Sequence, residues 1–426
     1  MIKNFLRTKA CLLMAGFVLL SCSQEDSITN EPADLDSVDL VQLRDELPAI
    51  TGASKAIPGQ YIVVYNREIT GDLGSTNSRY AQSQQGVIGL TQEILGNTRN
   101  ASNNIIHVYS KSVLGVTLRL SEEQVSLFRN DQRVMILEQD RIVQFAPPCG
   151  TPNGPPCDGD GGGGGGDTGG SQSTPWGITR VNGVNNYTGS NAAWILDSGI
   201  DLDHPDLNVD ESRAFNAFSS GQDGRSANDL NGHGTHVAGT IAALNNDIGV
   251  VGVAPGAAVI PVKVLDRRGS GSYSGVIAGV DHVAANASNG DVANMSLGGP
   301  ASAALDNAIA SAAQSGVKFA LAAGNEGQDA NNVSPARVNG SNIYTISAMS
   351  QGDNWASFSN YGNPPVDYCA PGVAIESTWK NGGYNTISGT SMASPHAAGV
   401  LLLGNASSDG VVNNDPDGNS DSIIVH

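Results

Sequence analysis

Three segments of this 426-residue chain hold residue types that could carry out acyl transfer. Asp197 follows an apolar run, His233 lies within 231–240, and Ser391 lies within 388–396. A serine hydroxyl becomes a nucleophile when a histidine takes its proton and a carboxylate orients that histidine. Taken singly, each residue also has a structural explanation, such as a turn aspartate or a serine N-cap. Their joint occurrence is what indicates catalysis.

The elements around these motifs have the pattern of a parallel sheet covered by helices on both faces. Such strands read as continuous apolar runs, and alanine-rich stretches of helical length lie between them. We expect helices over 276–287 and 303–315. We expect strands over 192–196, 259–265, 292–295, 319–322 and 344–347. Catalytic groups collect past the carboxyl ends of parallel strands, which is where the sequence places Asp197.

Two of the motifs are predicted to begin helices. At Ser391, unsatisfied backbone N–H groups and the positive end of the helix dipole could stabilise an oxyanion. Pro395 is compatible with the first turn of that helix. Small residues after His233 let its helix approach a sheet, and His236 is expected to point into supporting structure. A zinc site is not indicated, because the H-x-x-H spacing lacks the glutamate of the metalloprotease pattern.

The contexts DSGI, HGTHVAGT and GTSMASPH, in the chain order Asp, His, Ser, resemble the subtilisin/proteinase K family of serine peptidases over roughly 175–403. The resemblance implies that Ser391 is the nucleophile, His233 the general base and then acid, and Asp197 the group that orients the imidazole. Asn325 resembles the family's oxyanion-hole asparagine. The implied fold is an α/β, subtilisin-like three-layer α/β/α domain with a mostly parallel central sheet. The implied activity is that of a secreted serine endopeptidase that works through an acyl-enzyme.

The resemblance also implies a cleft for an extended peptide. Two glycine-containing segments would expose backbone N–H and C=O groups, between which a substrate strand could add by β-augmentation. The small, uncharged walls predict a broad preference for apolar or aromatic residues before the scissile bond (P1). The expected substrate-binding residues are Gly269, Gly271, Tyr273, Ser296, Leu297, Gly298, Ala323 and Gly324.

Structural calcium is implied in the same way, whereas the chemistry itself calls for no cofactor. Asp367 resembles a calcium-ligating aspartate of proteinase K-like relatives, with the carbonyls of Ser341 and Ile343 as companions. A second segment, 415–421, alternates oxygen ligands and includes a glycine, but it lacks the terminal glutamate of a calcium loop. A calcium loop and a polar tail therefore stay open there.

The chain before the catalytic segment divides by composition. Residues 1–22 combine basic residues with a short apolar run, as in a secretory signal peptide. Its end is either a lipobox, with Cys22 lipidated, or an ordinary cleavage site. Residues 23–56 are an acidic tether with few large apolar side chains. Residues 146–174 contain six consecutive glycines and are a flexible linker that holds the maturation cleavage.

Residues 57–145 have the β-α-β-β-α-β order of a small ferredoxin-like α+β unit. With the catalytic segment recognised, this unit resembles the family's inhibitory propeptide. It is expected to assist folding, to occupy the cleft as an intramolecular inhibitor, and to be cut off by Ser391 between Gln144 and Thr174. His107 and Glu138 are expected to be ordinary strand or surface residues.

Charge and cysteine usage limit the partners. The chain has 22 Lys plus Arg against 41 Asp plus Glu, a net charge of −19, which disfavours binding to nucleic acid or an anionic membrane. Protein or peptide substrates are the expected partners of a monomer. Cys149 and Cys157 are expected to form a disulfide across a short proline-containing loop. Cys369 is then a buried, inert thiol.

Two rival functions are weaker. A catalytically silent, lipid-anchored peptide-binding protein would be expected to lose one of the four catalytic residues, and none is lost. A nucleotide-binding protein is disfavoured because no glycine-rich phosphate fingerprint follows the first strand of the catalytic segment. We expect an exported, extracellular or cell-surface enzyme, released from an outer-membrane lipoprotein precursor if Cys22 is lipidated.

The catalytic domain is expected over 175–404, followed by a polar, Asp/Asn-rich tail over 405–426. Members of the family usually continue further beyond the nucleophile helix, whereas 30 residues follow His396 here. The portion after this helix is therefore expected to be shortened.

Overall fold

The computed structural model describes residues 55–71, 73, 80–96, 104–144, 171–184, 186–404 and 406–426. The expected signal peptide, nearly all of the acidic tether, most of the glycine-rich linker, and the Cys149–Cys157 pair lie outside these residues. No helix of the described part is both long and apolar enough to cross a membrane.

The first described unit is an antiparallel sheet covered by helices, as the sequence predicted. Its elements are β1 Ala56–Tyr65, α1 Arg67–Thr70, α2 Tyr80–Ile94, β2 Ile105–Tyr109, β3 Gly115–Arg119, α3 Glu122–Asn130 and β4 Val134–Gln144. The strand order is β2-β3-β1-β4, and β8 of the following domain adds to the β4 edge. Ser121 and Gln124 form a capping box that starts α3, and Phe128 of this helix packs into the unit's own core.

The second unit is built on a large, mostly parallel sheet. Its elements up to the seventh helix are α4 Trp176–Arg180, β5 Ala193–Asp197, β6 Phe215–Asn216, α5 His233–Ala242, β7 Val259–Lys263, β8 Ser270–Ser272, α6 Tyr273–Asn286, β9 Val292–Met295, β10 Gly299–Pro300 and α7 Ala303–Ala313. The remaining elements are β11 Lys318–Ala322, β12 Val333–Ser334, β13 Ile343–Ser350, β14 Asn354–Trp355, β15 Val366–Pro371, β16 Ile375–Trp379, β17 Gly383–Ile387, α8 Thr390–Leu403, β18 Ser407–Val411 and β19 Ser422–Val425. Two short 3-10 helices, Glu211–Arg213 and Ala330–Asn332, complete the set.

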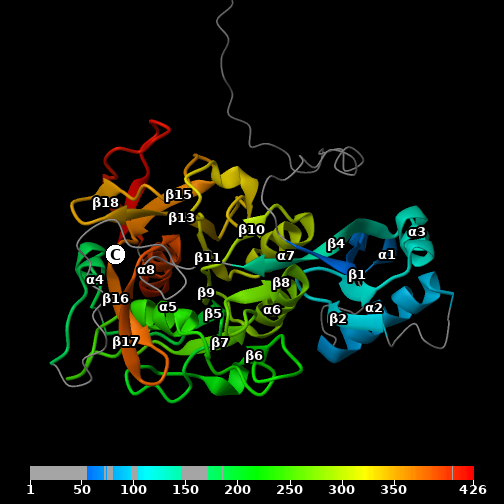
Figure 1. Cartoon of the computed structure of the whole chain (residues 1–426), viewed down its shortest axis with the longest axis horizontal. Coiled ribbons are helices and arrows are strands. Elements are labelled where there is room, and N and C mark those ends of the chain that lie inside the picture. The colour runs from blue at the N-terminus through cyan, green and yellow to red at the C-terminus, as the bar shows by residue number, and fades with distance from the viewer. Residues whose placement is uncertain are drawn as a thin grey trace, which may run out of the picture. The chain divides into compact units, whose positions relative to one another are not determined.

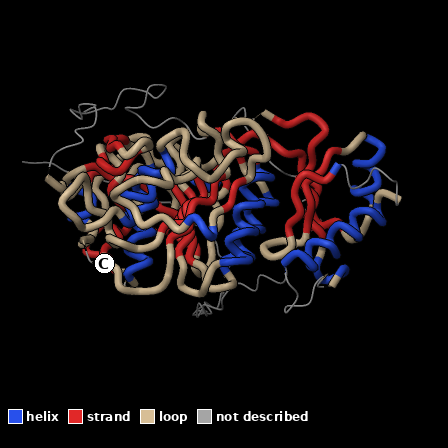
Figure 2. The backbone as a smooth tube through the Cα atoms, turned by 90° about the horizontal axis from the view of Figure 1, so that it is seen from below, coloured by secondary structure: helices blue, strands red, loops and turns tan. Residues whose placement is uncertain are grey.

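The main sheet separates two apolar cores, which gives the expected three layers (Figures 1 and 2). Helices α6 and α7 contribute to one core, and α5 and α8 to the other. Trp194 and Leu196 of β5 point into the first core, and Ala193 and Ile195 into the second. A strand buried on both faces needs apolar side chains at every position, which explains its continuous apolar run.

The strand order β15-β13-β11-β9-β5-β7-β6 places β5 between β9 and β7. The order of strands along the chain reverses at β5, and ligand sites of open parallel sheets lie at such a switch point. The predicted β7 over 259–265 ends earlier, at Lys263, because the backbone N–H groups of Val264 and Leu265 both donate to the carbonyl of Asp197. The chain therefore turns around the carboxyl end of β5.

The two ends of the second unit differ from the expected boundaries. Strand β19 pairs in parallel with β15, and β18 pairs antiparallel with β19, so the segment expected as a polar tail extends the main sheet. Its apolar run Ile423, Ile424 and Val425 is buried. At the other end, Ser171 and Ser173 form bridges to Ile248 and Val250, so pairing with this unit begins before residue 175.

Candidate active site

Asp197 and His233 are in direct contact at the carboxyl edge of the sheet. Nδ1 of His233 lies 2.9 Å from both carboxylate oxygens of Asp197, and both side chains are buried. Asp197 is the last residue of β5 and His233 the first of α5. A Cβ at Gly234 would lie 2.1 Å from the carbonyl of Gly199, so only glycine lets α5 approach β5 this closely.

Ser391 is the second residue of α8, the helix that packs against α5. Its Oγ donates to the carbonyl of Ser296 at 3.3 Å, and Ser296 Oγ donates back to the carbonyl of Ser391 at 2.8 Å. The sequence predicted Pro395 in the first turn of α8. In the structure this residue lies in the second turn. Because proline has no N–H, it cannot bond to the carbonyl four residues earlier, which is that of Ser391. The hydroxyl of Ser296 donates to this carbonyl instead, and it so anchors the turn that carries Ser391.

Asn325 follows β11 and faces the start of α8. Its Oδ1 accepts hydrogen bonds from the backbone nitrogen and the hydroxyl of Thr390, at 2.8 and 2.9 Å. A Cβ built on Gly389 would lie 3.5 Å from Nδ2 of Asn325 and 3.7 Å from the backbone nitrogen of Ser391. Two N–H donors therefore border one small space beside Ser391, which is the arrangement that stabilises an oxyanion.

One wall of the expected cleft is paired to the first unit. Strand β8, which includes Gly271, pairs antiparallel with the end of β4, with Val143 opposite Gly271. Gly269 precedes β8 with φ of 75°, in the left-handed region that favours glycine. Tyr273 begins α6, and its hydroxyl donates to the carbonyl of Pro300. A Cβ at Gly299 would lie 3.3 Å from a methyl group of Val143, so this side chain sits beside the cleft segments.

The other expected wall follows β9 and β11. Leu297 is buried and Gly298 half-buried after β9, and Ala323 is buried after β11. Gly324 donates its N–H to Thr390 Oγ1 at 3.1 Å and has φ of 107°. A Cβ on Gly324 would lie 2.6 Å from Glu326 Oε2, whose carboxylate accepts a bond from Asn360. The expectation of uncharged walls therefore omitted Glu326, which directly follows Asn325 in the sequence.

The expected calcium ligand Asp367 lies in β15 beside β13. Its Oδ2 accepts a hydrogen bond from the backbone nitrogen of Thr345 at 2.9 Å, and burial raises its pKa to about 6. Ile343 begins β13 and Ser341 precedes it, which puts their carbonyls on the neighbouring segment. Within the described part of the chain, no three acidic, histidine or cysteine side chains form a cluster that could hold a metal ion by themselves. A single carboxylate with backbone carbonyls suits a hard cation such as calcium.

In the second calcium candidate, 415–421, the aspartates accept hydrogen bonds from other groups of the protein. Asp415 and Asp417 accept hydrogen bonds from backbone nitrogens of the same loop. Asp421 is buried and accepts bonds from Ser347 and Asn363, and burial raises its pKa to about 6. This carboxylate therefore joins the C-terminal segment to the main sheet.

The histidine three residues after His233 has the expected supporting position. His236 is fully buried, and its Nε2 lies 3.0 Å from the carbonyl of Ile375. Burial lowers its pKa to about 3, so the ring stays neutral across the physiological range.

Sequence reasoning missed the carboxylate of α6 that binds the first unit. Asp281 accepts hydrogen bonds from the backbone nitrogens of Ser110, Lys111 and Ser112, and from the hydroxyls of Ser112 and Tyr80. It is a buried acid in an otherwise uncharged stretch apart from the adjacent His282. A lone carboxylate in an apolar helix is the signal that could have revealed this contact.

Glu138 is not the ordinary strand residue that was expected. Its Oε2 accepts a hydrogen bond from the backbone nitrogen of Ala304 at 3.2 Å, and Asp140 Oδ1 accepts one from Ser274 at 3.2 Å. These two carboxylates, two residues apart on β4, thus cap the first turns of α7 and α6.

Comparison with known proteins agrees with this geometry. Residues 194–409 match the model of the subtilase family, and residues 60–146 match that of the peptidase inhibitor I9 family. Alkaline serine exoprotease A of Vibrio alginolyticus is 38% identical over 396 residues, which cover 90% of this chain and 68% of that protein. The extracellular serine proteinase of Thermus sp. (strain Rt41A) is 36% identical over 92% of this chain and 88% of its own length.

Subtilisin E of Bacillus subtilis (strain 168) is 46% identical over 305 residues, which cover 69% of this chain and 71% of that protein. The crystal structure of a cold-adapted subtilisin-like serine proteinase superposes with a TM-score of 0.50 at 40% identity, over 58% of this chain and 96% of that one. With Asp197 against His233 and an I9-type unit paired to β8, the chain belongs to the subtilase family of serine endopeptidases.

Proposed function

We propose that Ser391 is the nucleophile of this peptidase, His233 its general base and acid, and Asp197 the group that orients His233. The contact of His233 Nδ1 with both oxygens of Asp197 carries this proposal, because it fixes which ring nitrogen holds the proton. The other nitrogen, Nε2, then takes the proton of Ser391 and later returns it to the leaving amine. The buried carboxylate stabilises the imidazolium that forms in between.

The oxyanion of the tetrahedral intermediate would lie between Asn325 Nδ2 and the backbone nitrogen of Ser391. Both donors border the space beside Gly389, and both are held before substrate arrives. Pre-oriented donors need no reorganisation as charge develops on the oxygen, which is why they lower the barrier.

The precursor is an autoinhibited zymogen in this proposal. Residues 57–145 inhibit the domain and assist its folding, and β4 occupies the cleft edge as a substrate strand would. Ser391 then cuts the chain between Gln144 and Thr174, within the glycine-rich linker. Residues 1–22 direct export, and 23–56 tether the precursor, through Cys22 if that residue is lipidated. The Thermus relative is named as extracellular, and we infer the same location for the mature enzyme.

Substrates would bind as extended strands between 269–273 and 296–298. We infer a broad preference for apolar or aromatic P1 residues, from the small residues Ala323 and Gly324 on the other wall. Glu326, which Asn360 holds beside Gly324, would accept an occasional basic P1 residue. Calcium at Asp367, with the carbonyls of Ser341 and Ile343, would brace β13 against β15 without taking part in the chemistry.

The test compares the chain from Ser23 onward with its Ser391→Ala variant, both with calcium present. We expect the first to lose its N-terminal unit, as seen by intact mass, and to digest casein. We expect the variant to fold, stay full length and remain inactive. N-terminal sequencing of the active species locates the maturation bond, and an active species that starts at Ser23 would contradict release. If the chain from Ser23 onward folds but stays full length and inactive, the alternative function, a catalytically silent peptide-binding protein, would be favoured.

A further inference from the structure

A lysine is completely buried beside the catalytic aspartate. Lys263 ends β7, lies opposite Asp197 in the pairing of β5 with β7, and has no exposed surface. Lysine is rarely buried without partners, because taking an unpaired ammonium out of water is strongly unfavourable. The proposed mechanism assigns this side chain no role, so its contacts need an explanation.

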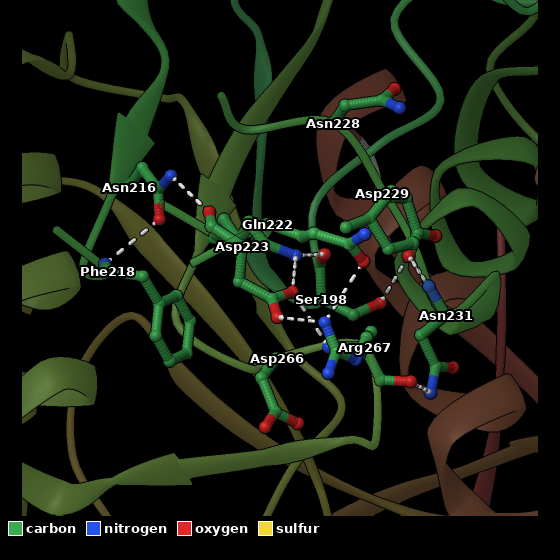
Figure 3. Close-up of polar contacts among 12 residues, drawn as sticks. Ser198, Asn216, Phe218, Gln222, Asp223, Asn228, Asp229, Asn231, Asp266 and Arg267 are labelled. Atoms are coloured by element: carbon green, nitrogen blue, oxygen red, sulfur yellow. Dashed lines mark hydrogen bonds and ion pairs between the residues drawn. The ribbon is translucent and has the colours of Figure 1, made fainter. Parts of the chain in front are cut away.

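The ammonium of Lys263 joins two separate segments. Nζ donates to the carbonyl of Ser198 at 2.5 Å and lies 3.3 Å from Oδ1 of Asp223. It also lies over the ring of Phe218, 6.0 Å from the ring centroid. Asp223 belongs to the loop 217–232, which leads from β6 to α5 (Figure 3).

Ser198 transmits this contact to the carboxylate of Asp197. The backbone nitrogen of Ser198 donates to Asp197 Oδ1 at 2.7 Å, which is one of the two oxygens that hold His233. The carbonyl that Lys263 binds belongs to this same serine, so a shift of Ser198 moves the donor that fixes Asp197. Lys263 therefore acts on Asp197 through one residue.

The other side of Ser198 is held by Asp229 of the same loop. Ser198 Oγ donates to Asp229 Oδ1 at 2.9 Å and accepts the N–H of Gly234 at 3.0 Å. Asp229 Oδ2 accepts the backbone nitrogen and the hydroxyl of Thr235, at 3.0 and 2.7 Å. Asp229, whose contact with Ser198 is drawn in Figure 3, thus ties Ser198 to the first turn of α5, which begins at His233.

Asp223 is itself anchored, so it can serve as a fixed counter-charge. Its Oδ1 accepts the backbone nitrogen of Arg267 at 2.9 Å, and its carbonyl accepts Nδ2 of Asn216 at 2.8 Å. The side chain is only 12% exposed, where an ion pair is screened less than at the surface.

We propose that buried Lys263, paired with the partly buried Asp223, positions Asp197 for its work on His233 by holding Ser198 through its carbonyl. Both are positioning residues, because neither reaches the substrate. The inference rests on the proposed catalytic roles of Asp197, His233 and Ser391. A small displacement of a catalytic group can slow a reaction about 100-fold, so a group that fixes Asp197 is worth testing.

The test measures how fast a fluorophosphonate probe labels Ser391 in the purified mature enzyme. Two quantities are separated, the second-order labelling rate constant and the final fraction labelled. A purely structural role would lower the fraction that folds and leave the rate constant unchanged. A positioning role lowers the rate constant of every labelled molecule. Thermal unfolding and kcat and KM on a chromogenic peptide are measured alongside.

The main variant is Lys263→Met, which keeps an unbranched apolar side chain one atom shorter than lysine and removes the charge. We expect its labelling rate constant and kcat to fall about 10- to 100-fold, with KM changed much less. The matched control is Lys318→Met, because Lys318 Nζ also donates to a backbone carbonyl, that of Leu401, at 2.8 Å. Lys318 begins β11 and so lies at the amino ends of the strands, whereas the site lies at their carboxyl ends. This variant should therefore label at the wild-type rate.

Asp223→Asn is the second variant, for the case in which Lys263→Met does not fold. It keeps an oxygen for the N–H of Arg267 and removes only the counter-charge, so we expect a smaller slowing of the same kind. A folded Lys263→Met, or Asp223→Asn, that labels at the wild-type rate would overturn the proposal. A wild type that is not labelled, or a Ser391→Ala variant that labels equally, would instead refute the proposed function.

Discussion

Glu138 of β4 accepts a hydrogen bond from the backbone nitrogen of Ala304 at 3.2 Å, at the first turn of α7. The inhibitory unit therefore supplies a carboxylate to a helix N-terminus of the domain that it inhibits. The positive end of the helix dipole and the orphan N–H groups favour such an anion, while its burial at the contact disfavours the charge. Burial is the larger effect, since the pKa of Glu138 is raised.

The folded zymogen should lose stability as pH rises. Burial, with the Glu138 carboxylate adding to it, raises the pKa of Asp306 on α7 to about 7. The folded zymogen thus binds more protons than the unfolded chain between about pH 4 and 7, so this contribution is fullest at low pH and is lost as pH rises through about 7. In the uncleavable Ser391→Ala chain, Glu138→Gln should raise the melting temperature at pH 8 and change it little at pH 5. An equal effect at both values would contradict the coupling.

Loss of the Asp281 carboxylate should speed release of the inhibitory unit. Asn at this position turns one of the oxygens facing Ser110, Lys111 and Ser112 into a donor, which repels their N–H groups. We expect a shorter lag between self-cleavage and casein hydrolysis for Asp281→Asn. The kcat of the mature variant serves as the control and should equal the wild-type value. An unchanged lag would mean that other contacts hold the unit.

The proposed oxyanion donor, Asn325, can be removed while the bonds to the turn that it supports are kept. Asn325→Asp keeps oxygens for the two bonds from Thr390, and it replaces the N–H donor with a carboxylate oxygen that also brings negative charge at neutral pH. We expect kcat to fall about 100- to 1,000-fold with little change in KM. The melting temperature should stay near that of the wild type at neutral pH. A loss of less than tenfold would remove Asn325 from the oxyanion hole.

Calcium should stabilise the mature enzyme through Asp367 in a pH-dependent way. With the pKa of this carboxyl at about 6, protons compete with the cation below that pH. We expect calcium over EDTA to raise the melting temperature at pH 8 and to have much less effect at pH 5. Asp367→Asn should lose the effect at both values. A full calcium effect in that variant would place the ion elsewhere.

The thiol of Cys369 should be inert in the folded protein. It is fully buried in β15, and burial raises its pKa well above the ordinary value, so little thiolate forms near neutral pH. We expect no labelling of Cys369 by iodoacetamide in the native mature enzyme and full labelling in guanidinium chloride. Native labelling at a rate comparable to the denatured control would show that β15 opens.

The amino-acid sequence alone predicted the main sheet, and its motifs single out the three residues to which we assign the catalytic roles. Strands β5, β7, β9, β11 and β13 lie where the apolar runs predicted them, because a strand buried on both faces needs apolar residues throughout. The family motifs around Asp197, His233 and Ser391 are long enough to be recognised together. Local composition also predicted the helices α6 and α7 and the four strands of the inhibitory unit.

Only the tertiary structure decided which polar side chains support these residues. Glu138 looks like a solvated strand residue until α7 is placed against β4, and the apolar run 423–425 looks like part of a tail until β15 offers it an edge. Lys263 closes an apolar strand and meets its partners 65 residues away at Ser198 and 40 away at Asp223. Whether a charge is buried and paired depends on contacts between segments that are distant in the sequence. Such contacts cannot be predicted from periodicity or from local spacing.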